Sequence, residues 1–594
     1  MENVTRLFDL LPRYQENFKP KDDAIAGKEN GKWVRYSIDK YRTAADSISY
    51  ALLASGVKAG DRVATIMPSR PEWNFLDMGI MQAGAVHVPV YPTISESDYK
   101  HILNHAGVKF IFISGKDIYR KIEHIVPDIE GLIEVFAVKE TEGVRTLSAF
   151  MEYGSQNANP QLLDSIKSTV KSDDLATLIY TSGTTGNPKG VMLSHANIIS
   201  NFKGVSHIPP IGEEGRALSY LPLCHVYERM LNYMYQYLGI SVYYAENMAT
   251  IGDNLKEIQP DILTTVPRLL EKIYDKIIGT GRKLKGIKKV IFFWSVSVGL
   301  RFELNGKNGW YYETKLKIAR KLVFNKWKVA VGGNMKVIVS GGAALQPRLA
   351  RIFWAAGIPV LEGYGLTETS PVIAVNDFDE NGLLFGTVGR VLKCVDARIA
   401  EDDEILCKGP GLMLGYYKEP ELTAEAIDAD GWFHTGDIGV IGELGHLKIT
   451  GRKKEIFKTS LGKYISPELI ENKFKESSFI DTLMVVGENQ KFAAALIVPD
   501  FVYLRNWCAI KEIEYTTDAE MILLPRIKKR FQKELDKYNK FFGATEQVKR
   551  FVLIDHEWTI ESGELTASLK LRRKFICQKY DAVTRLIFNI DSDD

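Results

Sequence analysis

The chain has 594 residues, of which 45% are hydrophobic and 25% are charged, and its formal net charge is +2. A chain of this length forms several packed units rather than one core, and its composition is typical of soluble globular proteins. The small net charge argues against a nucleic-acid binder. The five cysteines include no CxxC pair, which argues against a disulfide scaffold or a zinc site and favours a cytoplasmic protein with reduced thiols.

No targeting or membrane-spanning segment is apparent. Residues 1–15 contain acidic side chains and no long apolar stretch, so we expect no signal peptide. No uninterrupted apolar run approaches the ~20 residues that a transmembrane helix needs. The sequence therefore favours a cytoplasmic location.

Short apolar strands alternate with helical stretches along much of the chain. Residues 61–93 have the pattern of a strand, a helix and a second strand. Further apolar strands are expected at residues 110–114, 175–182, 261–267 and 335–345. This alternation predicts parallel sheets covered by helices, with ligand-binding loops at the carboxyl ends of the strands.

The pattern changes between residues 386 and 450, where short strands are interrupted by frequent glycine and aspartate. This part predicts a small barrel or an antiparallel sheet. A polar, basic turn follows, and we place a hinge at residues 451–455. The rest of the chain is long enough for a domain of its own. We therefore expect an N-terminal domain at 1–451 and a C-terminal domain at 452–594.

Residues 281–336 differ from the rest of the chain in charge. They contain fourteen Lys or Arg and two acids, a local charge of +12, so the remainder of the chain carries −10. Nine aromatic residues are interleaved with the basic ones. One interpretation is a basic helical hairpin that packs on the main domain. The other is a surface that meets anionic lipid, where basic residues gain energy and aromatic rings favour the headgroup level.

The segment 180–190, YTSGTTGNPKG, is rich in glycine and hydroxyl side chains. It does not match the GxxxxGK[ST] pattern of P-loop nucleotidases, because the sixth position counted from Gly183 is Pro188. Its glycines allow close backbone approach, consecutive N–H groups can form an anion nest, and Lys189 adds a cation. A flexible linker fits poorly, since a strand precedes the segment and a helix is expected to start at Ser194. We therefore predict a phosphate site.

YTSGTTGNPKG resembles the phosphate loop of the AMP-forming adenylate ligases, the superfamily of acyl-CoA synthetases, peptide-synthetase adenylation domains and firefly luciferase. Four later segments resemble further motifs of this superfamily in their usual order: GYGLTETS (363–370), DGWFHTGDIG (430–439), GRKKEIFKTSLGKYISP (451–467) and GELTASLKLRR (563–573). The resemblance spans roughly residues 33–574. It implies an α/β fold, with a large N-terminal domain of two doubly wound sheets plus a small β-barrel, hinged to a small, mobile α+β C-terminal domain.

The resemblance also implies a two-step reaction. A carboxylate attacks the α-phosphate of ATP to give an acyl-adenylate and pyrophosphate, and the acyl group then passes to the thiol of coenzyme A. Lys570 would bridge the substrate carboxylate and the α-phosphate. Thr367 would donate to the α-phosphate, and Glu368 would hold Mg²⁺. His225, in LPLCHVYER, matches a histidine near the reacting carboxylate.

The remaining site residues are also implied by the motifs. The hinge would turn at Lys454, and Gly462 would line the pantetheine tunnel of coenzyme A. The ATP and AMP contacts would be Thr181, Ser182, Gly183, Thr184, Thr185 and Lys189 at the β- and γ-phosphates, Gly341, Gly342, Ala343, Gly363, Tyr364 and Gly365 at the adenine, and Asp437 and Arg452 at the ribose.

The motifs leave the acid open, but three features favour a long-chain fatty acid. LPLCHVYERM (221–230) and GKYISPELIE (462–471) resemble the long-chain acyl-CoA synthetase branch, which also tends to carry extra sequence at 281–336. The apolar, aromatic stretch 228–246 either lines a fatty-acyl channel or belongs to the core. The alternatives are a ligase for another hydrophobic acid, transfer to acyl carrier protein, and a non-catalytic nucleotide- or acyl-binding relative. Chain-length preference and oligomeric state cannot be read from the sequence.

Overall fold

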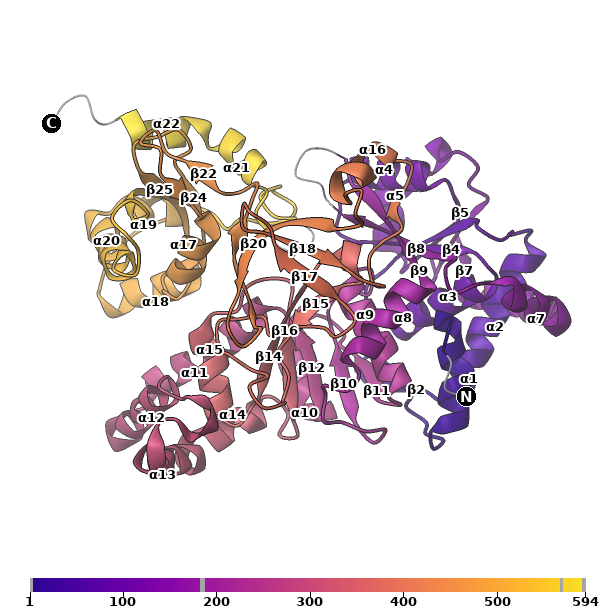
Figure 1. Ribbon diagram of the computed structural model, residues 1–594, viewed down its shortest axis with the longest axis horizontal. Helices are drawn as coiled ribbons and strands as arrows, with labels where there is room; N and C mark the ends of the chain where they lie inside the picture. The colour runs from indigo at the N-terminus through magenta and orange to yellow at the C-terminus, as the bar shows by residue number, and fades with distance from the viewer. Residues whose placement is uncertain (1–3, 182–186, 567–569, 590–594) are drawn as a thin grey trace. The chain divides into compact units, whose positions relative to one another are not determined.

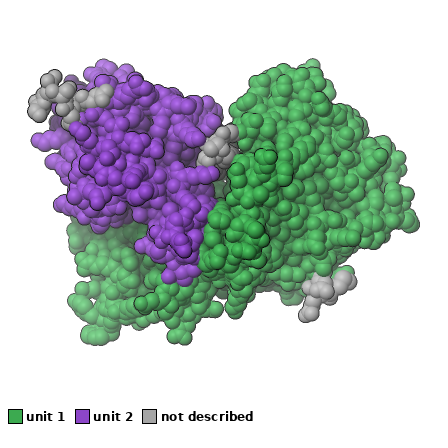
Figure 2. Space-filling model, turned by 45° about the horizontal axis from the view of Figure 1, so that its top comes forward, with its two compact units in different colours: residues 1–398, 406–434, 442–447 green, residues 399–405, 435–441, 448–594 purple. Residues whose placement is uncertain are grey.

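Figure 1 shows a computed structural model of the chain, which describes residues 4–181, 187–566 and 570–589. The chain divides into two compact units, which Figure 2 colours separately. Unit 1 comprises residues 1–398, 406–434 and 442–447, and unit 2 comprises residues 399–405, 435–441 and 448–594. Each unit has a hydrophobic core of its own.

Unit 1 contains an eight-stranded sheet whose strands, in spatial order, are β19 (Gly415–Tyr416), β9 (Lys189–Ser194), β8 (Leu175–Thr181), β4 (Val86–Val90), β3 (Arg62–Ile66), β5 (Val108–Ile113), β6 (Glu134–Ala137) and β7 (Arg145–Thr146). The strands from β8 to β7 are parallel, and β9 and β19 are antiparallel additions at one edge. The prediction for residues 61–93 is confirmed, since α3 (Pro71–Gln82) connects β3 to β4.

A second, nine-stranded sheet of unit 1 has the spatial order β16 (Arg390–Val391), β15 (Val372–Val375), β14 (Val360–Gly365), β13 (Val337–Ser340), β12 (Ile262–Thr265), β10 (Arg216–Ser219), β11 (Ser241–Tyr244), β1 (Ile25–Glu29) and β2 (Lys32–Tyr36). Its centre, from β14 to β1, is parallel, and its edges are antiparallel. Because the central strands are buried on both faces, they are short apolar runs, which is why the sequence pattern located them.

The largest hydrophobic core takes side chains from both sheets, for example Val191 of β9 and Val242 of β11. Helices α8 (His195–Val205) and α9 (Val226–Tyr237) contribute to the same core, and residues 226–236 are all buried. The other α-helices of unit 1 outside the basic segment are α1 (Leu10–Asn17), α2 (Ile38–Ala54), α4 (Glu96–Ala106), α5 (Lys116–Ile122), α6 (Leu147–Gln156), α7 (Pro160–Thr169), α10 (Ile251–Ile258), α11 (Pro267–Lys283), α15 (Pro347–Ala355) and α16 (Pro420–Ala426).

The basic segment 281–336 is mainly helical, as expected. Its α-helices are α12 (Gly286–Gly299), α13 (Gly309–Ala319) and α14 (Asn325–Ala330) (Figure 1). The aromatic side chains divide into two groups. Phe292 and Trp327 are buried in a second hydrophobic core of unit 1, whereas Trp310 and Tyr311 are 80% and 62% exposed. The segment therefore both packs on unit 1 and presents aromatic rings to solvent.

A four-stranded sheet has the spatial order β17 (Asp396–Ile399), β18 (Glu404–Lys408), β20 (Phe433–Ile441) and β21 (Leu447–Arg452). Of the two forms that the sequence left open for residues 386–450, the described residues thus form an open sheet with β17 and β21 at its edges. The division between the units falls within all four of these strands, and the chain enters unit 2 for the last time at Lys448, in β21.

Unit 2 is a small α+β domain. Its three-stranded sheet has the order β24 (Ile480–Val486), β25 (Ala493–Pro499) and β26 (Val548–Leu553), and a two-stranded ribbon consists of β22 (Phe457–Lys458) and β23 (Tyr464–Ile465). Its α-helices are α17 (Pro467–Phe474), α18 (Phe501–Ile510), α19 (Asp518–Leu523), α20 (Pro525–Asn539), α21 (Arg573–Lys579) and α22 (Asp581–Asn589). The predicted α/β fold, with a large sheet-rich N-terminal part and a smaller C-terminal domain, is confirmed. In place of the predicted small β-barrel, the described residues form the open four-stranded sheet.

Within residues 4–181, 187–566 and 570–589, none of the helices combines the length and the apolar character needed to cross a bilayer.

Candidate active site

The predicted phosphate loop connects two antiparallel strands. Thr181 ends β8 and is paired with Lys189, which begins β9. The predicted phosphate contacts Ser182, Gly183, Thr184 and Thr185 lie outside the described residues. The helix expected at Ser194 is confirmed, because the Ser194 hydroxyl accepts the backbone N–H of Asn197 and caps α8. The intervening strand β9 was not predicted.

Lys189, Tyr416 and Glu368 form one cluster in unit 1. The Tyr416 hydroxyl donates to Glu368 Oε1 across 2.9 Å, and Lys189 Nζ lies 5.2 Å from the centroid of the Tyr416 ring. Burial raises the pKa of Tyr416, and the Glu368 carboxylate raises it further, so the hydroxyl stays protonated. The structure therefore places a carboxylate and a lysine from two separate motifs on either side of one tyrosine.

The predicted adenine and metal residues follow one another in the chain. Gly363, Tyr364 and Gly365 end β14, and Thr367 and Glu368 lie in a 3-10 turn, η6 (Thr367–Thr369). A Cβ at Gly365 would lie 1.8 Å from the carbonyl oxygen of Pro371, whereas at Gly363 the nearest heavy atom would be 3.5 Å away. Glycine is thus required at Gly365, where two backbone segments touch directly before the turn that carries Glu368.

The other predicted wall of the adenine site, Gly341, Gly342 and Ala343, follows β13. The N–H of Gly341 donates to the carbonyl oxygen of Thr265 across 3.1 Å. A Cβ at Gly341 would lie 3.0 Å from the Tyr227 ring, so the backbone runs tightly against that ring. Gly342 has a φ of +78°, a conformation that favours glycine.

His225 lies at the N-terminus of α9. Its Nδ1 accepts the backbone N–H of Tyr227 across 3.1 Å, so the side chain caps the helix. Because Nδ1 accepts, the proton of a neutral His225 ring is assigned to Nε2. The Tyr227 hydroxyl donates to the carbonyl oxygen of Val339 in β13, across 3.2 Å. Tyr227 therefore connects His225 to the strand that leads into Gly341.

Two adjacent residues hold α9 between the sheets. Arg229 pairs with Asp77 of α3 and donates to the Thr177 hydroxyl of β8 across 2.7 Å. Glu228 accepts the Thr264 hydroxyl of β12 across 2.8 Å. Burial raises the pKa of Glu228 to about 7, against the hydrogen bonds that lower it. The stretch 228–246, which the sequence assigned either to an acyl channel or to the core, thus begins with buried polar anchors.

In unit 2, Asp437 and Arg452 form an ion pair. Arg452 Nε donates to Asp437 Oδ1 across 2.8 Å, and Asp437 is only 6% exposed. Asp437 lies in β20 and Arg452 ends β21. The structure thus joins the two residues that were predicted to contact ribose.

Lys570 lies within electrostatic reach of this pair. Its side chain as a whole is exposed. Partial desolvation nevertheless lowers the pKa of Lys570, and Arg452 lowers it further, while Asp437, Glu468 and Glu455 act in the opposite direction. Lys570, Asp437 and Arg452, predicted from three motifs, therefore share one electrostatic environment.

Lys454 and Gly462 lie near this cluster in the chain. Lys454 is exposed in a turn that is closed by hydrogen bonds from the N–H groups of Glu455 and Ile456 to the carbonyl oxygen of Arg452. Gly462 connects β22 to β23 with a φ of +78°, and its N–H donates to Thr459. A left-handed conformation at such a tight connection favours glycine.

Comparison with known proteins identifies the family. The AMP-binding enzyme family matches residues 13–417. The chain belongs to this family. The resemblance inferred from the motifs is confirmed.

Relatives of this AMP-binding enzyme align over nearly their whole length. The long-chain-fatty-acid–CoA ligase FadD15 of Mycobacterium bovis is 31% identical over 575 residues, which cover 94% of this chain and 93% of that protein. The peroxisomal long chain acyl-CoA synthetase 6 of Arabidopsis thaliana is 32% identical over 593 residues, with 95% and 82% covered.

Solved structures share the fold of this AMP-binding enzyme. The anthranilate CoA ligase AuaEII in complex with anthranoyl-AMP has a TM-score of 0.73 at 16% identity, with 98% of both chains covered. A fatty acyl CoA synthetase of Mycobacterium tuberculosis has a TM-score of 0.63 at 20% identity, with 98% of this chain and 100% of that chain covered.

Sequence reasoning missed Tyr416, the tyrosine between Lys189 and Glu368 in this AMP-binding enzyme. Nothing local marks Tyr416 as a site residue, because its partners are 48 residues or more away in the chain. The pairing of β19 with β9, in which Tyr416 lies opposite Val191, brings it to the cluster. Only a prediction of this strand pair could have found it.

Proposed function

We propose that the protein is an AMP-forming long-chain fatty acid–CoA ligase. It activates a fatty acid with ATP to give acyl-AMP and pyrophosphate, and then transfers the acyl group to coenzyme A, releasing AMP. The observation that carries this proposal is the near full-length likeness to relatives named long-chain-fatty-acid–CoA ligases. The cluster of Lys570, Asp437 and Arg452 supports it, because this cluster combines a ribose acceptor with two cations.

The first half-reaction concentrates negative charge between the acid and the α-phosphate. The Lys570 ammonium group stabilises that charge, because preorganised cations in a partly dehydrated site act more strongly than in water. Asp437 holds the ribose hydroxyls with its carboxylate oxygens, and the ion pair with Arg452 orients that carboxylate. Thr367 donates to the α-phosphate, and His225 donates from Nε2 near the reacting carboxylate.

The loop at 181–189 holds the pyrophosphate end of ATP. Thr181, Ser182, Gly183, Thr184, Thr185 and Lys189 supply its backbone N–H groups, hydroxyls and ammonium group. The adenine lies between Gly341, Gly342 and Ala343 on one side and Gly363, Tyr364 and Gly365 on the other. These roles are assigned from the motifs.

The residues present fit Mg²⁺ bound together with ATP. Within the described residues, no group of three or more His, Cys, Asp or Glu could hold a metal ion alone. Mg²⁺ in nucleotide sites needs only one or two carboxylates, since phosphate oxygens and water complete its coordination. Glu368, whose carboxylate accepts the hydroxyl of the same Tyr416 ring that Lys189 lies over, supplies such a ligand. When bound, the ion neutralises phosphate charge.

In the second half-reaction, the segment that contains Gly462 replaces Lys570 at the acyl-adenylate. We assign Lys454 as the pivot, where a few backbone torsions absorb the rotation of the C-terminal domain at 452–594 against the N-terminal domain at 1–451. Gly462 then lines the pantetheine path. The exposed position of Lys454 in a short turn supports this assignment.

The test of the function is pyrophosphate release from ATP with acids of increasing chain length, with and without coenzyme A. We expect release with long-chain acids, and thioester only when coenzyme A is present. No release with any acid would contradict the proposed reaction. A preference for acyl carrier protein over coenzyme A as the acyl acceptor would support the alternative acceptor. Pyrophosphate release with shorter hydrophobic acids alone would support the alternative acids.

We also propose that the protein is cytoplasmic and docks on anionic membrane through residues 281–336. Trp310 and Tyr311 are exposed at the start of α13, and Ile287 and Val290 are 69% and 63% exposed on α12. Lysines with exposed side chains lie near them in the chain: Lys285, Lys288, Lys289, Lys307 and Lys317. Aromatic rings favour the headgroup level, and each basic residue near anionic lipid contributes about 1 kcal/mol.

Vesicle flotation tests this docking. We expect vesicles that contain phosphatidylserine to retain the protein at low salt, and high salt to release it. The double variant Lys288→Glu/Lys289→Glu should lose retention. A matched control, Lys528→Glu/Lys529→Glu, changes an adjacent pair of exposed lysines on α20 and should retain it. Equal loss in both variants, or no retention of the unmodified protein, would contradict the proposal.

A further inference from the structure

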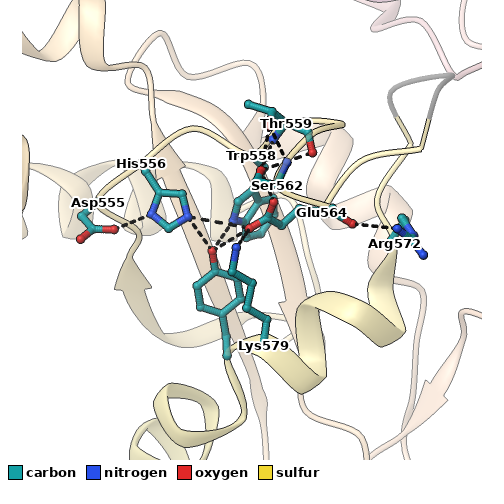
Figure 3. Close-up of polar contacts among 10 residues, drawn as sticks. Asp555, His556, Trp558, Thr559, Ser562, Glu564, Arg572 and Lys579 are labelled. Carbon is teal, nitrogen blue, oxygen red and sulfur yellow. Dashed lines mark hydrogen bonds and ion pairs between the residues drawn. The ribbon is translucent and has the colours of Figure 1, made fainter. Parts of the chain in front are cut away.

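A fully buried carboxylate, Glu564, lies close in the chain to Lys570. Glu564 is 0% exposed and accepts Lys579 Nζ across 2.6 Å and the Tyr580 hydroxyl across 3.1 Å. The Ser562 hydroxyl donates to its other carboxylate oxygen. Figure 3 shows Lys579 and Ser562 pointing at Glu564 from different segments. The single carboxylate of Glu564 therefore accepts hydrogen bonds from three side chains.

Main-chain hydrogen bonds connect Glu564 to the segment that carries Lys570. The N–H of Arg572 donates to the carbonyl oxygen of Glu564 across 2.8 Å (Figure 3), and Leu565 pairs with Leu571 as an antiparallel bridge. The N–H of Thr566 donates to the carbonyl oxygen of Lys570, and the N–H of Lys570 donates to the Thr566 hydroxyl across 3.0 Å. Residues 564–566 and 570–572 are therefore two arms of one hairpin, with Glu564 at its base and Lys570 on the opposite arm.

The partners of Glu564 tie this hairpin to the helix that follows it. Lys579 ends α21 and Tyr580 comes directly after it. The Tyr580 hydroxyl also receives Trp558 Nε1 across 3.1 Å and lies 3.0 Å from His556 Nε2. The base of the hairpin is thus fixed to the far end of α21 and to the segment before the hairpin.

The near end of α21 is fixed as well. Arg573, its first residue, pairs with Glu455 across 2.8 Å and with Glu471 of α17 across 2.6 Å. The second arm of the hairpin runs into this helix. Two ion pairs, one at each end of α21 and each with a buried carboxylate, Glu564 or Glu471, therefore define where the hairpin stands in unit 2.

The charge state of Glu564 agrees with an anchoring role. Burial would raise the pKa of Glu564, but the hydrogen bonds that its carboxylate accepts, chiefly from Lys579 and Ser562, together lower it by more, so that the overall shift is downward. An ionised carboxylate accepts from three donors at once, and a buried anion without them would be strongly destabilised.

We propose that Glu564 is a positioning residue for Lys570: by binding Ser562, Lys579 and Tyr580, it holds the hairpin in the shape that delivers the Lys570 ammonium group to the adenylation step. This inference rests on the proposed function. Glu564 itself touches neither substrate, and its effect passes through the main chain to Lys570. Because small displacements of a catalytic group reduce its effect steeply, the inference predicts a selective loss of one half-reaction.

The test measures the two half-reactions separately in the full-length protein. We expect Glu564→Ala to lower kcat for acyl-AMP formation by about 30-fold, with the KM for ATP changed by less than about threefold. Thioester formation from supplied acyl-adenylate should stay within about twofold, since Lys570 acts in the first step. Glu564→Gln keeps one oxygen acceptor for Tyr580 and Lys579, while its amide N–H can donate to the Ser562 hydroxyl, and should restore part of the rate.

A matched control is Glu534→Ala. Glu534 is 5% exposed on α20, accepts the Ser477 hydroxyl across 2.8 Å and pairs with Arg530, so it copies the burial and partner types of Glu564 away from the hairpin. We expect this variant to lose stability without a selective effect on acyl-AMP formation. A selective loss of the same size in Glu534→Ala would overturn the inference.

A variant with a smaller change tests the inference in case Glu564→Ala does not fold. Tyr580→Phe removes one hydroxyl that donates to Glu564 and should lower the rate of acyl-AMP formation about threefold to tenfold, with an unchanged rate of thioester formation. Unchanged acyl-AMP formation in both Glu564→Ala and Tyr580→Phe, or equal loss of both half-reactions, would overturn the inference. If the unmodified protein forms no acyl-AMP with any acid, the proposed function fails instead, so the two failures are distinguishable.

Discussion

Arg452 Nε donates to Asp437 Oδ1 across 2.8 Å, which links the end of β21 to the interior of β20. Because Asp437 is buried and paired with Arg452, its carboxylate is held in one orientation, as the proposed bidentate contact with two ribose hydroxyls requires. The same pair lies in the electrostatic environment of Lys570. In the proposed reaction, ribose recognition and adenylation therefore depend on one cluster.

Asp437→Asn should weaken ATP binding. The amide accepts through only one oxygen, so one ribose contact is lost, and the Arg452 charge loses its partner. We expect the KM for ATP to rise at least about tenfold, which corresponds to the loss of a hydrogen bond to a charged group. Steady-state kinetics with ATP as the varied substrate measures this change. An unchanged KM for ATP would contradict the ribose assignment, and the KM for the fatty acid serves as the internal control.

Lys570→Ala should abolish acyl-AMP formation, with a loss of at least about 100-fold in kcat. Thioester formation from supplied acyl-adenylate should be largely spared. Lys574→Ala, which removes an exposed cation on α21 only a few residues away, is the control and should leave both half-reactions close to those of the unmodified protein. Equal loss of both half-reactions in Lys570→Ala would refute its assignment.

Gly365→Ala should disrupt the end of β14, which carries the proposed adenine contacts, whereas Gly363→Ala should be tolerated. A methyl group at Gly365 would meet the carbonyl oxygen of Pro371 at 1.8 Å, so the backbone must shift, at a cost of about 2 kcal/mol or more. At Gly363 the nearest contact is 3.5 Å, which is ordinary. Thermal unfolding and ATP-dependent pyrophosphate release measure the two variants, and equal effects would show that the close approach at Gly365 is not the cause.

Glu362→Gln should change the dependence of stability on pH. Burial raises the pKa of Glu362 to about 8, against a value near 4.5 for the unfolded chain. Between these values the folded protein keeps a proton that the unfolded chain has released, so the free energy of unfolding falls as pH rises from about 4.5 to about 8. The glutamine variant does not titrate, and its stability should fall less over this window.

Denaturant unfolding at several pH values measures this difference for Glu362→Gln. Glu228, whose pKa is also raised, still titrates in the variant, so the decline should become shallower rather than vanish. The exposed Glu380 provides the control, since Glu380→Gln replaces a carboxylate on the surface of the same unit. A parallel pH profile for Glu362→Gln and the unmodified protein would contradict the prediction.

The sequence predicted several elements because their signals are local. The apolar runs of β3, β8 and β13 and the capping serine at Ser194 depend on neighbouring residues only, and each was found close to its place. Strand β9 was missed because its few residues follow a glycine-rich loop, where the apolar run is too short to distinguish a strand from the approach to a helix. The site residues were identified from motifs, which carry order along the chain but no geometry.

By itself, the sequence determined the α/β class and identified a candidate phosphate loop and Lys570, Asp437 and Glu368 as candidate site residues. The tertiary structure alone decided which of them meet: Tyr416 reaches Glu368 through the pairing of β19 with β9, and Glu564 reaches Tyr580 through the course of α21. Local patterns follow from the conformational preferences of adjacent residues, but these contacts depend on how distant segments pack, and no local preference encodes that packing.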